Sequence, residues 1–139
     1  MKEPILFNDR VNRETYRLMW LRSFNDPVVV RIEKNNEDYM LYWKIRCDSC
    51  ENNRLTLNNS RIISKREWNS FKWQLQKTFY WRMWSKIPSL AIGLDGSEWI
   101  LEGSNKNNYH VVDRWSPDNT SYRKCCTYLL QMTDIKNIK

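Results

Sequence analysis

The fold class of this chain follows from one stretch, Val28-Val29-Val30-Arg31-Ile32-Glu33-Lys34-Asn35-Asn36-Glu37-Asp38-Tyr39-Met40-Leu41-Tyr42-Trp43-Lys44-Ile45-Arg46. It begins with β-branched residues, passes through a polar segment and ends in a run of aromatic and aliphatic residues. β-Branched and aromatic residues favour strands, whereas Asn and Asp favour the turn between them. The stretch therefore predicts an antiparallel hairpin of two strands.

Similar patterns on both sides of this hairpin extend the predicted sheet. Before it, Tyr16–Arg22 alternates imperfectly and fits either a strand or a short helix, and after it a short strand is expected near Arg54–Leu57. Further along, Glu98–Glu102 and Tyr109–Trp115 have strand composition, and the loop Gly103–Asn108 separates them. This second pair is predicted to form another hairpin.

Two helices are expected as well. Ser64 followed by Glu67 is a capping-box pattern, and it predicts a helix from about Lys65 to Thr78. Its apolar stripe is expected to comprise Trp68, Phe71, Leu75 and Phe79. A second helix is expected at about Ser121–Met132, with a stripe of Tyr122, Cys125, Leu129 and Met132. Hairpins combined with helices predict an α+β fold, an antiparallel sheet of about five or six strands with two helices packed on one face.

Length and composition indicate one folded domain. The 139 residues are expected to form a single domain over 1–139, with a core over about 14–133. Hydrophobic residues make up 41% of the chain and include eight Trp, so the chain can bury a core without metals or disulfides. Only the ends, Met1–Asn8 and Asp134–Lys139, are expected to fray.

The charge balance is basic. The formal net charge is +7, and the pI is about 9.3. This balance fits an anionic partner, and it fits simple solubility equally well. No stretch approaches the roughly 20 apolar residues of a membrane span, so no span is expected. The first residues lack the pattern of a signal peptide, which predicts a cytoplasmic protein, or a periplasmic one if a leader has been removed.

Four blocks of sequence stand out along the chain: Tyr16–Arg22 with Pro27–Arg31, Glu67-Trp68 with Phe71, Gly93–Gly103 (GLDGSEWILEG), and Tyr109–Pro117 (YHVVDRWSP). Together they resemble a family of small, uncharacterised bacterial proteins that carry these blocks in this order. The resemblance covers about Tyr16 to Met132 and implies a bacterial source and one compact domain, but no activity. Members of that family tend to be Gly-rich where this chain has Cys47-Asp48-Ser49-Cys50, so the resemblance gives the cysteines no role.

The second hairpin holds a cluster of polar residues. Alternation along a strand puts Glu98 and Glu102 on one face, and it puts His110 and Arg114 on one face. If both sets lie on the same side, His110 and a carboxylate from Glu98, Glu102 or Asp113 would form a general acid–base site. The alternative is a solvated sheet face with cross-strand charge pairs. No nucleophile motif or phosphate-binding loop accompanies the cluster, so the second interpretation is favoured and no cofactor is expected.

The four cysteines leave several states open. Cys47-x-x-Cys50, Cys125-Cys126 and His110 together suggest a zinc site. Adjacent residues in a helix point about 100° apart and cannot easily share an ion, so no metal site is predicted. A disulfide within Cys47–Cys50 or to the helix, and inert buried thiols, are the open alternatives.

The aromatic residues suggest binding. Cations alternate with Trp in Lys72-Trp73, Trp81-Arg82 and Trp84-Ser85-Lys86, as in proteins that hold single-stranded nucleic acid, but no nucleic-acid-binding motif is present. Trp, Tyr, Met and Arg are also enriched at protein interfaces. The sequence favours a non-catalytic protein-binding domain, for example of the immunity or antitoxin kind, that binds another protein or itself. An enzyme centred on His110 and a nucleic-acid-binding domain are the alternatives. The predicted contact residues are Asp95, Glu98, Glu102, His110, Arg114, Trp115, Trp81 and Trp84.

Overall fold

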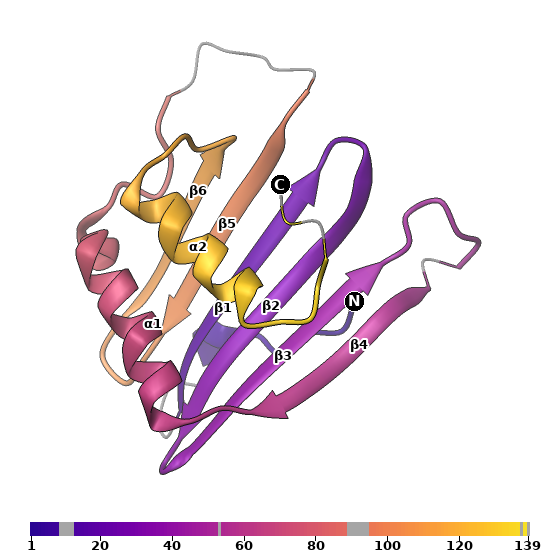
Figure 1. Ribbon diagram of the computed structural model, residues 1–139. Coiled ribbons are helices and arrows are strands. Elements are labelled where there is room, and N and C mark those ends of the chain that lie inside the picture. Colours follow the sequence, from indigo (N-terminus) through magenta and orange to yellow (C-terminus); the bar gives the residue numbers. More distant parts are fainter. Residues whose placement is uncertain (9–12, 53, 89–94, 137, 139) are drawn as a thin grey trace.

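The chain folds into one antiparallel sheet covered by two helices on one face (Figure 1). The computed structural model describes residues 1–8, 13–52, 54–88, 95–136 and 138, so Gly93 and Leu94 of the third sequence block lie outside the described residues. The sheet has six strands in the order β4-β3-β2-β1-β5-β6, which confirms the predicted fold class. The elements are β1 (Arg13–Arg22), β2 (Asn25–Asn35), β3 (Asp38–Arg46), β4 (Leu55–Ile62), α1 (Lys65–Lys77), β5 (Ser97–Ser104), β6 (Tyr109–Trp115) and α2 (Ser121–Gln131).

Antiparallel pairing of successive strands places β1 to β4 side by side in chain order. The stretch that starts at Tyr16 is a strand, and it occupies the middle of the sheet between β2 and β5. After β4, α1 carries the chain back over one face, and β5 then pairs with β1 (Figure 1). The observed β4 extends beyond the predicted Arg54–Leu57, and β5 includes Gly103 and Ser104, which the sequence pattern places in a loop.

The core lies between the sheet and the helices. Alternate residues of the central strands, such as Leu18 and Trp20, share one buried cluster with Phe71 and Leu75 of α1 and Leu129 of α2. Burial of these aromatic and aliphatic side chains is the main force that holds the helices on the sheet. None of the helices in the described part of the chain is long and apolar enough to cross a membrane.

The capping box of α1 is present as predicted. The Ser64 hydroxyl accepts a hydrogen bond of 3.1 Å from the backbone amide of Glu67, and the Glu67 carboxylate accepts one of 2.8 Å from the amide of Ser64. Arg61 of β4 also donates to the Glu67 carboxylate, at 2.7 Å, and lowers the pKa of Glu67. The start of α1 is therefore fixed both locally and to the sheet.

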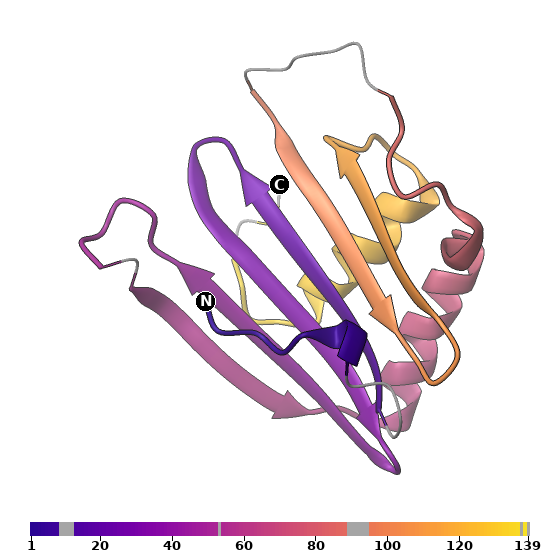
Figure 2. The ribbon, with the colours of Figure 1, turned by 180° about the vertical axis from the view of Figure 1, so that it is seen from behind.

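The prediction of a frayed N-terminus is wrong. Residues 1–8 lie across the sheet face opposite the helices (Figure 2). The Glu3 carboxylate accepts hydrogen bonds from Arg31, at 3.0 Å, and from Lys44, at 2.6 Å, and the side chain of Leu6 is buried. The cations on this face explain the docking, because Glu3 supplies a carboxylate that pairs with them as they are buried.

Candidate functional site

The register of the second hairpin separates the residues predicted to form an acid–base site. His110 is opposite Gly103, and Glu102 is opposite Val111. His110 and Arg114 therefore lie on the face covered by the helices, while Glu98, Glu102 and Asp113 lie on the other face. The condition for a site in which His110 meets a carboxylate of this hairpin is not met.

Glu102 makes its contacts on the sheet face opposite the helices. Its buried carboxylate accepts a hydrogen bond of 3.1 Å from Nε of Arg17 and one of 2.8 Å from the Tyr109 hydroxyl. Arg17 also donates to the carbonyl of Pro4, at 2.8 Å. These contacts join β1, β5, β6 and the N-terminal segment, which is a structural role.

Glu98 and Asp113 are the two carboxyl groups that the hairpin does bring together. Partial burial raises the pKa of Glu98, and its hydrogen bond with Asp113 and the charge of Asp113 raise it further. Lys86 offsets part of this effect, since its Nζ lies 3.3 Å from the Asp113 carboxylate. His110 is not in contact with this carboxyl pair. Among the described residues, Lys86 is the one cation that interacts with it.

His110 holds a segment of backbone. Its Nε2 lies 2.8 Å from the carbonyl oxygen of Met83, so this nitrogen carries the proton and donates it. The ring centroid lies 5.3 Å from that of Tyr80 and 6.4 Å from that of Trp81. Both Nε2 and the ring of His110 are therefore engaged by the segment after α1.

We call that segment, Phe79–Ile87, the strap. It runs along the outer side of β6, where the amide of Asp113 donates a 2.7 Å hydrogen bond to the carbonyl of Ser85. The Arg114 guanidinium donates to the carbonyl of Trp84, at 2.7 Å. Two of the predicted site residues, His110 and Arg114, thus help to fix the backbone of the strap.

Tyr80 anchors the strap to the sheet. Its side chain is buried, and its hydroxyl lies 2.7 Å from the carbonyl of His110 and 3.0 Å from that of Leu101. Gly103 makes room for the Tyr80 ring, because a Cβ at residue 103 would come within 2.9 Å of that ring and of Tyr16. The strap is consequently a fixed part of the structure, although it has only one short 3-10 turn, Tyr80–Arg82.

The strap presents large apolar side chains to solvent. The exposed fractions are 72% for Phe79 and 75% for Trp84, and Ile87 is more than half exposed. Trp81, predicted as a contact residue, is only partly exposed because it packs against Tyr80 and Tyr16. The prediction that Phe79 lies on the buried stripe of α1 is wrong, since the helix ends at Lys77 and Phe79 lies beyond it with φ of 54°.

Sequence reasoning missed Phe79 and Ile87 as surface residues for a physical reason. Helical spacing from Leu75 would bury Phe79, but the left-handed backbone at this position turns the chain away from the helix axis. Glycine or asparagine usually occupies such a position, so a phenylalanine there does not signal the end of a helix. Pro88 was the one sequence signal that the helix must end. It lies well beyond Lys77, so it did not locate the end of the helix.

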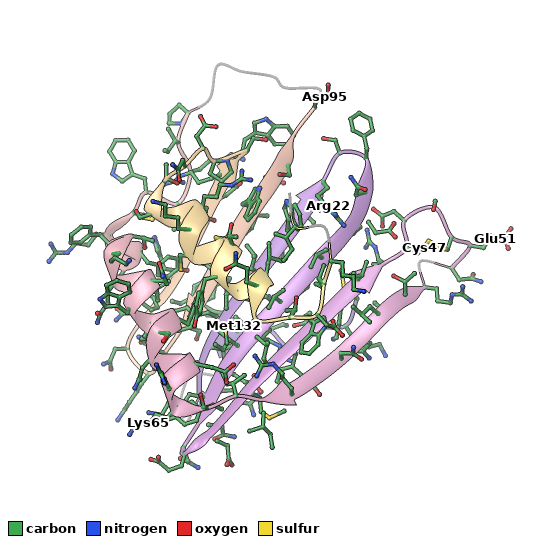
Figure 3. All side chains as sticks on the ribbon, viewed as in Figure 1. Arg22, Cys47, Glu51, Lys65, Asp95 and Met132 are labelled. Atoms are coloured by element: carbon green, nitrogen blue, oxygen red, sulfur yellow. A yellow bond between two sulfur atoms is a disulfide. The ribbon has the colours of Figure 1, made fainter. Side chains whose placement is uncertain are left out.

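The remaining predicted contact residues lie elsewhere. Asp95 is exposed just before β5, at the end of the sheet away from Lys65, where α1 begins (Figure 3). Trp115 ends β6 and covers Gly96, where a Cβ would meet its ring at 2.8 Å. Neither residue contacts the strap in the interactions of the described residues.

The cysteines adopt two of the predicted alternatives. Cys47 and Cys50 form a disulfide in the loop between β3 and β4, with Cα atoms 5.4 Å apart. Cys125 and Cys126 are free and buried in α2, and burial raises the pKa of the Cys125 thiol to about 12. Within the described residues, no group of three or more His, Cys, Asp or Glu side chains is placed to hold a metal ion.

The outer surface of the helices is basic. The two helices contain six Lys and Arg residues against one Glu, and that Glu is bound to Arg61. In the described part of the chain, no carboxylate lies within ion-pair distance of Lys65, Arg66, Lys77 or Lys124. Trp73 is 57% exposed on the same surface, and Lys77 lies 3.4 Å above the centre of its ring. Two shallow grooves of about 640 and 760 Å³ follow α1 and α2.

Comparison with known proteins adds no assignment: no protein-family model matches the chain, and no curated protein is significantly similar to it.

Proposed function

We propose that the protein is a non-catalytic binding domain that contacts another protein through the strap. The observation that carries the proposal is the exposure of Phe79, Trp84 and Ile87 within nine residues of chain. Aromatic side chains supply much of the binding energy at protein interfaces. Exposed apolar patches of this kind mark sites of protein interaction.

The rigidity of the strap supports the proposal. Contacts from Tyr80, His110, Asp113 and Arg114 fix its backbone on the sheet. A surface that is already ordered loses little conformational entropy on binding, so more of the contact energy appears as affinity. A flexible loop without such contacts would have to become ordered on binding, and the entropy lost would reduce its affinity.

Phe79 gives a second argument. A phenylalanine with φ of 54° is strained by about 1–2 kcal/mol relative to a residue in the right-handed region. Burial of the ring does not offset this strain, because the side chain is largely exposed. Strain of this kind is expected where the side chain serves an interaction outside the chain.

The test is comparative affinity capture from cells that make the protein, read by quantitative mass spectrometry. We expect one stoichiometric partner with the wild type, and we expect Phe79→Ala/Trp84→Ala to lose it. Phe24→Ala is the matched control, because Phe24 is 79% exposed in the turn between β1 and β2 and is not part of the strap. Equal capture by all three proteins would contradict the proposal.

Single-stranded nucleic acid is a second candidate ligand. It is favoured by Trp73 and by the cations of α1 and α2 that have no carboxylate partner in the described part of the chain. Fluorescence anisotropy with a labelled thymidine 20-mer tests it. Lys77→Ala and Lys124→Ala should each reduce the slope of log K against log salt by about 0.7, and Lys106→Ala in the β5–β6 turn should not. Binding that is absent at about 50 mM salt would exclude this candidate.

A related proposal concerns the compartment. Disulfides persist mainly in oxidising compartments, so the Cys47–Cys50 pair supports the exported alternative over the cytoplasmic one. Thiol titration of unfolded protein purified without reductant should find two free thiols, those of Cys125 and Cys126. Four free thiols would support the cytoplasmic alternative.

A further inference from the structure

We propose that β4 pairs with β4 of a second copy, so that the sheets of two molecules join into one. The starting observation is the position of β4 at the outer end of the strand order. Within the described residues, no strand or helix covers its outer side, and both views show β4 at the margin of the fold (Figures 1 and 2). An edge strand carries a row of backbone N–H and C=O groups that can pair with another strand.

The composition of β4 lacks the features that usually prevent such pairing. Residues 56–60, Thr-Leu-Asn-Asn-Ser, contain no charge and no proline. Edge strands of soluble proteins are commonly protected by lysine, proline, a covering segment or a short length. β4 has eight residues, and every one of them is at least partly exposed.

Arg61 is the single charged residue of β4, and it is directed away from the edge. Its guanidinium donates to the Glu67 carboxylate, at 2.7 Å, and to the carbonyl of Met132, at 3.1 Å. Both partners belong to the side of the sheet that carries the helices. The charge is therefore neutralised by Glu67, and it does not oppose the approach of another strand.

A second copy is the occupant that β4 itself fits. Antiparallel pairing about a two-fold axis perpendicular to the sheet centres on Asn58 or on Asn59, because paired residues must face the same side. With Asn58 at the centre, Arg61 lies opposite Leu55, and with Asn59 at the centre it lies opposite Leu57. In neither register does a cation lie opposite a cation, so the uncharged residues 56–60 can pair with the same residues of a second copy without repulsion.

The opposite edge of the sheet is partly covered. The strap occupies the outer side of β6 through the Asp113–Ser85 hydrogen bond and the bridge between Lys86 and Asp113. The strap hinders pairing at this edge, and a two-fold contact between β4 strands uses the β4 strand of both copies, so pairing stops at two copies. The proposal does not depend on the strap as a protein-contact surface.

Sedimentation equilibrium at about 0.15 M salt, over roughly 1 to 200 µM protein, tests the pairing, since edge contacts are small and give weak association. We expect a monomer–dimer equilibrium. Asn58→Lys should raise the dissociation constant at least about tenfold, because two lysines meet near the two-fold axis. Asn107→Lys adds the same charge to the β5–β6 turn and should leave the equilibrium unchanged. A monomer throughout the range, or a dimer that tolerates Asn58→Lys, would overturn the proposal.

Hydrogen exchange locates the interface and separates the two proposals. Amides of residues 55–62 should exchange more slowly at high protein concentration than at low concentration, and amides of the strap should not change. Concentration-dependent protection in the strap would mean association through Phe79 and Trp84, and the β4 proposal would then be wrong. Loss of a partner from the Phe79→Ala/Trp84→Ala protein bears only on the strap.

Discussion

The sheet has two edge strands, β4 and β6, and they differ in whether another part of the chain covers them. The strap contacts β6 through the backbone of Asp113 and the side chain of Arg114, and we call this the closed edge. No strand or helix of the described residues covers β4, and Arg61, its one charged residue, is bound to Glu67 on the helix side of the sheet. The difference separates two ways of binding. The closed edge displays side chains on a fixed backbone, whereas the open edge offers the backbone itself.

The largest effect should come from removing the anchor of the closed edge. Tyr80→Ala deletes a buried aromatic ring and the hydroxyl that binds two sheet carbonyls, so we expect the free energy of unfolding to fall by about 3–5 kcal/mol. Urea unfolding measures it. Trp84→Ala on the same strap is the control, and its change should stay below about 0.5 kcal/mol. Equal effects of the two variants would mean that the strap is not anchored by Tyr80.

His110→Ala should have the next largest effect. It removes the hydrogen bond to Met83 and the ring contacts with Tyr80 and Trp81, which predicts a loss of about 1–2 kcal/mol. Faster amide exchange in the strap, with no change in β4, would place the effect at the closed edge. An unchanged melting temperature would show that these contacts do not stabilise the fold.

Phe79→Gly should stabilise the fold and weaken binding. Glycine adopts φ of 54° without strain, so we expect the free energy of unfolding to rise by about 0.5–1 kcal/mol. The same variant lacks the exposed ring and should retain less partner in affinity capture. Stability that falls would show that the Phe79 ring makes net stabilising contacts within the chain, and the argument from strain would fail.

The smallest effect is expected at Glu98. Partial burial and the neighbouring Asp113 raise its pKa and so disfavour the ionised carboxylate, and Glu98→Gln should therefore raise stability at neutral pH by about 0.5 kcal/mol. A raised pKa contributes stability below the unfolded-state pKa and loses it as the pH rises through the folded-state value. The advantage of the variant should therefore vanish at low pH and grow towards neutrality, which unfolding at a series of pH values measures. An advantage that is constant with pH would rule out the carboxyl pair as its cause.

Local pattern predicted the two helices and the two hairpins, but it left Tyr16–Arg22 open between a strand and a short helix and made β4 too short. The capping box at Ser64 and Glu67 defined the start of α1, and β-branched and aromatic runs predicted the two hairpins. These signals depend on residues close in sequence, so they can be recognised without the tertiary structure. The antiparallel sheet with two helices on one face followed from them.

The candidate sites depended on contacts between distant residues. The spacing predicted that His110 and Arg114 share a face of the sheet. Which face this is depends on where the helices pack, and both side chains then bind backbone carbonyls of the strap. The docking of Glu3 could not be predicted because its partners, Arg31 and Lys44, are 28 and 41 residues away. The sequence by itself determined the two helices, the two hairpins and the excess of positive charge. Only the tertiary structure decided which edge is closed, which aromatic rings reach solvent and where the N-terminal segment docks, because each of these is set by non-local burial and pairing.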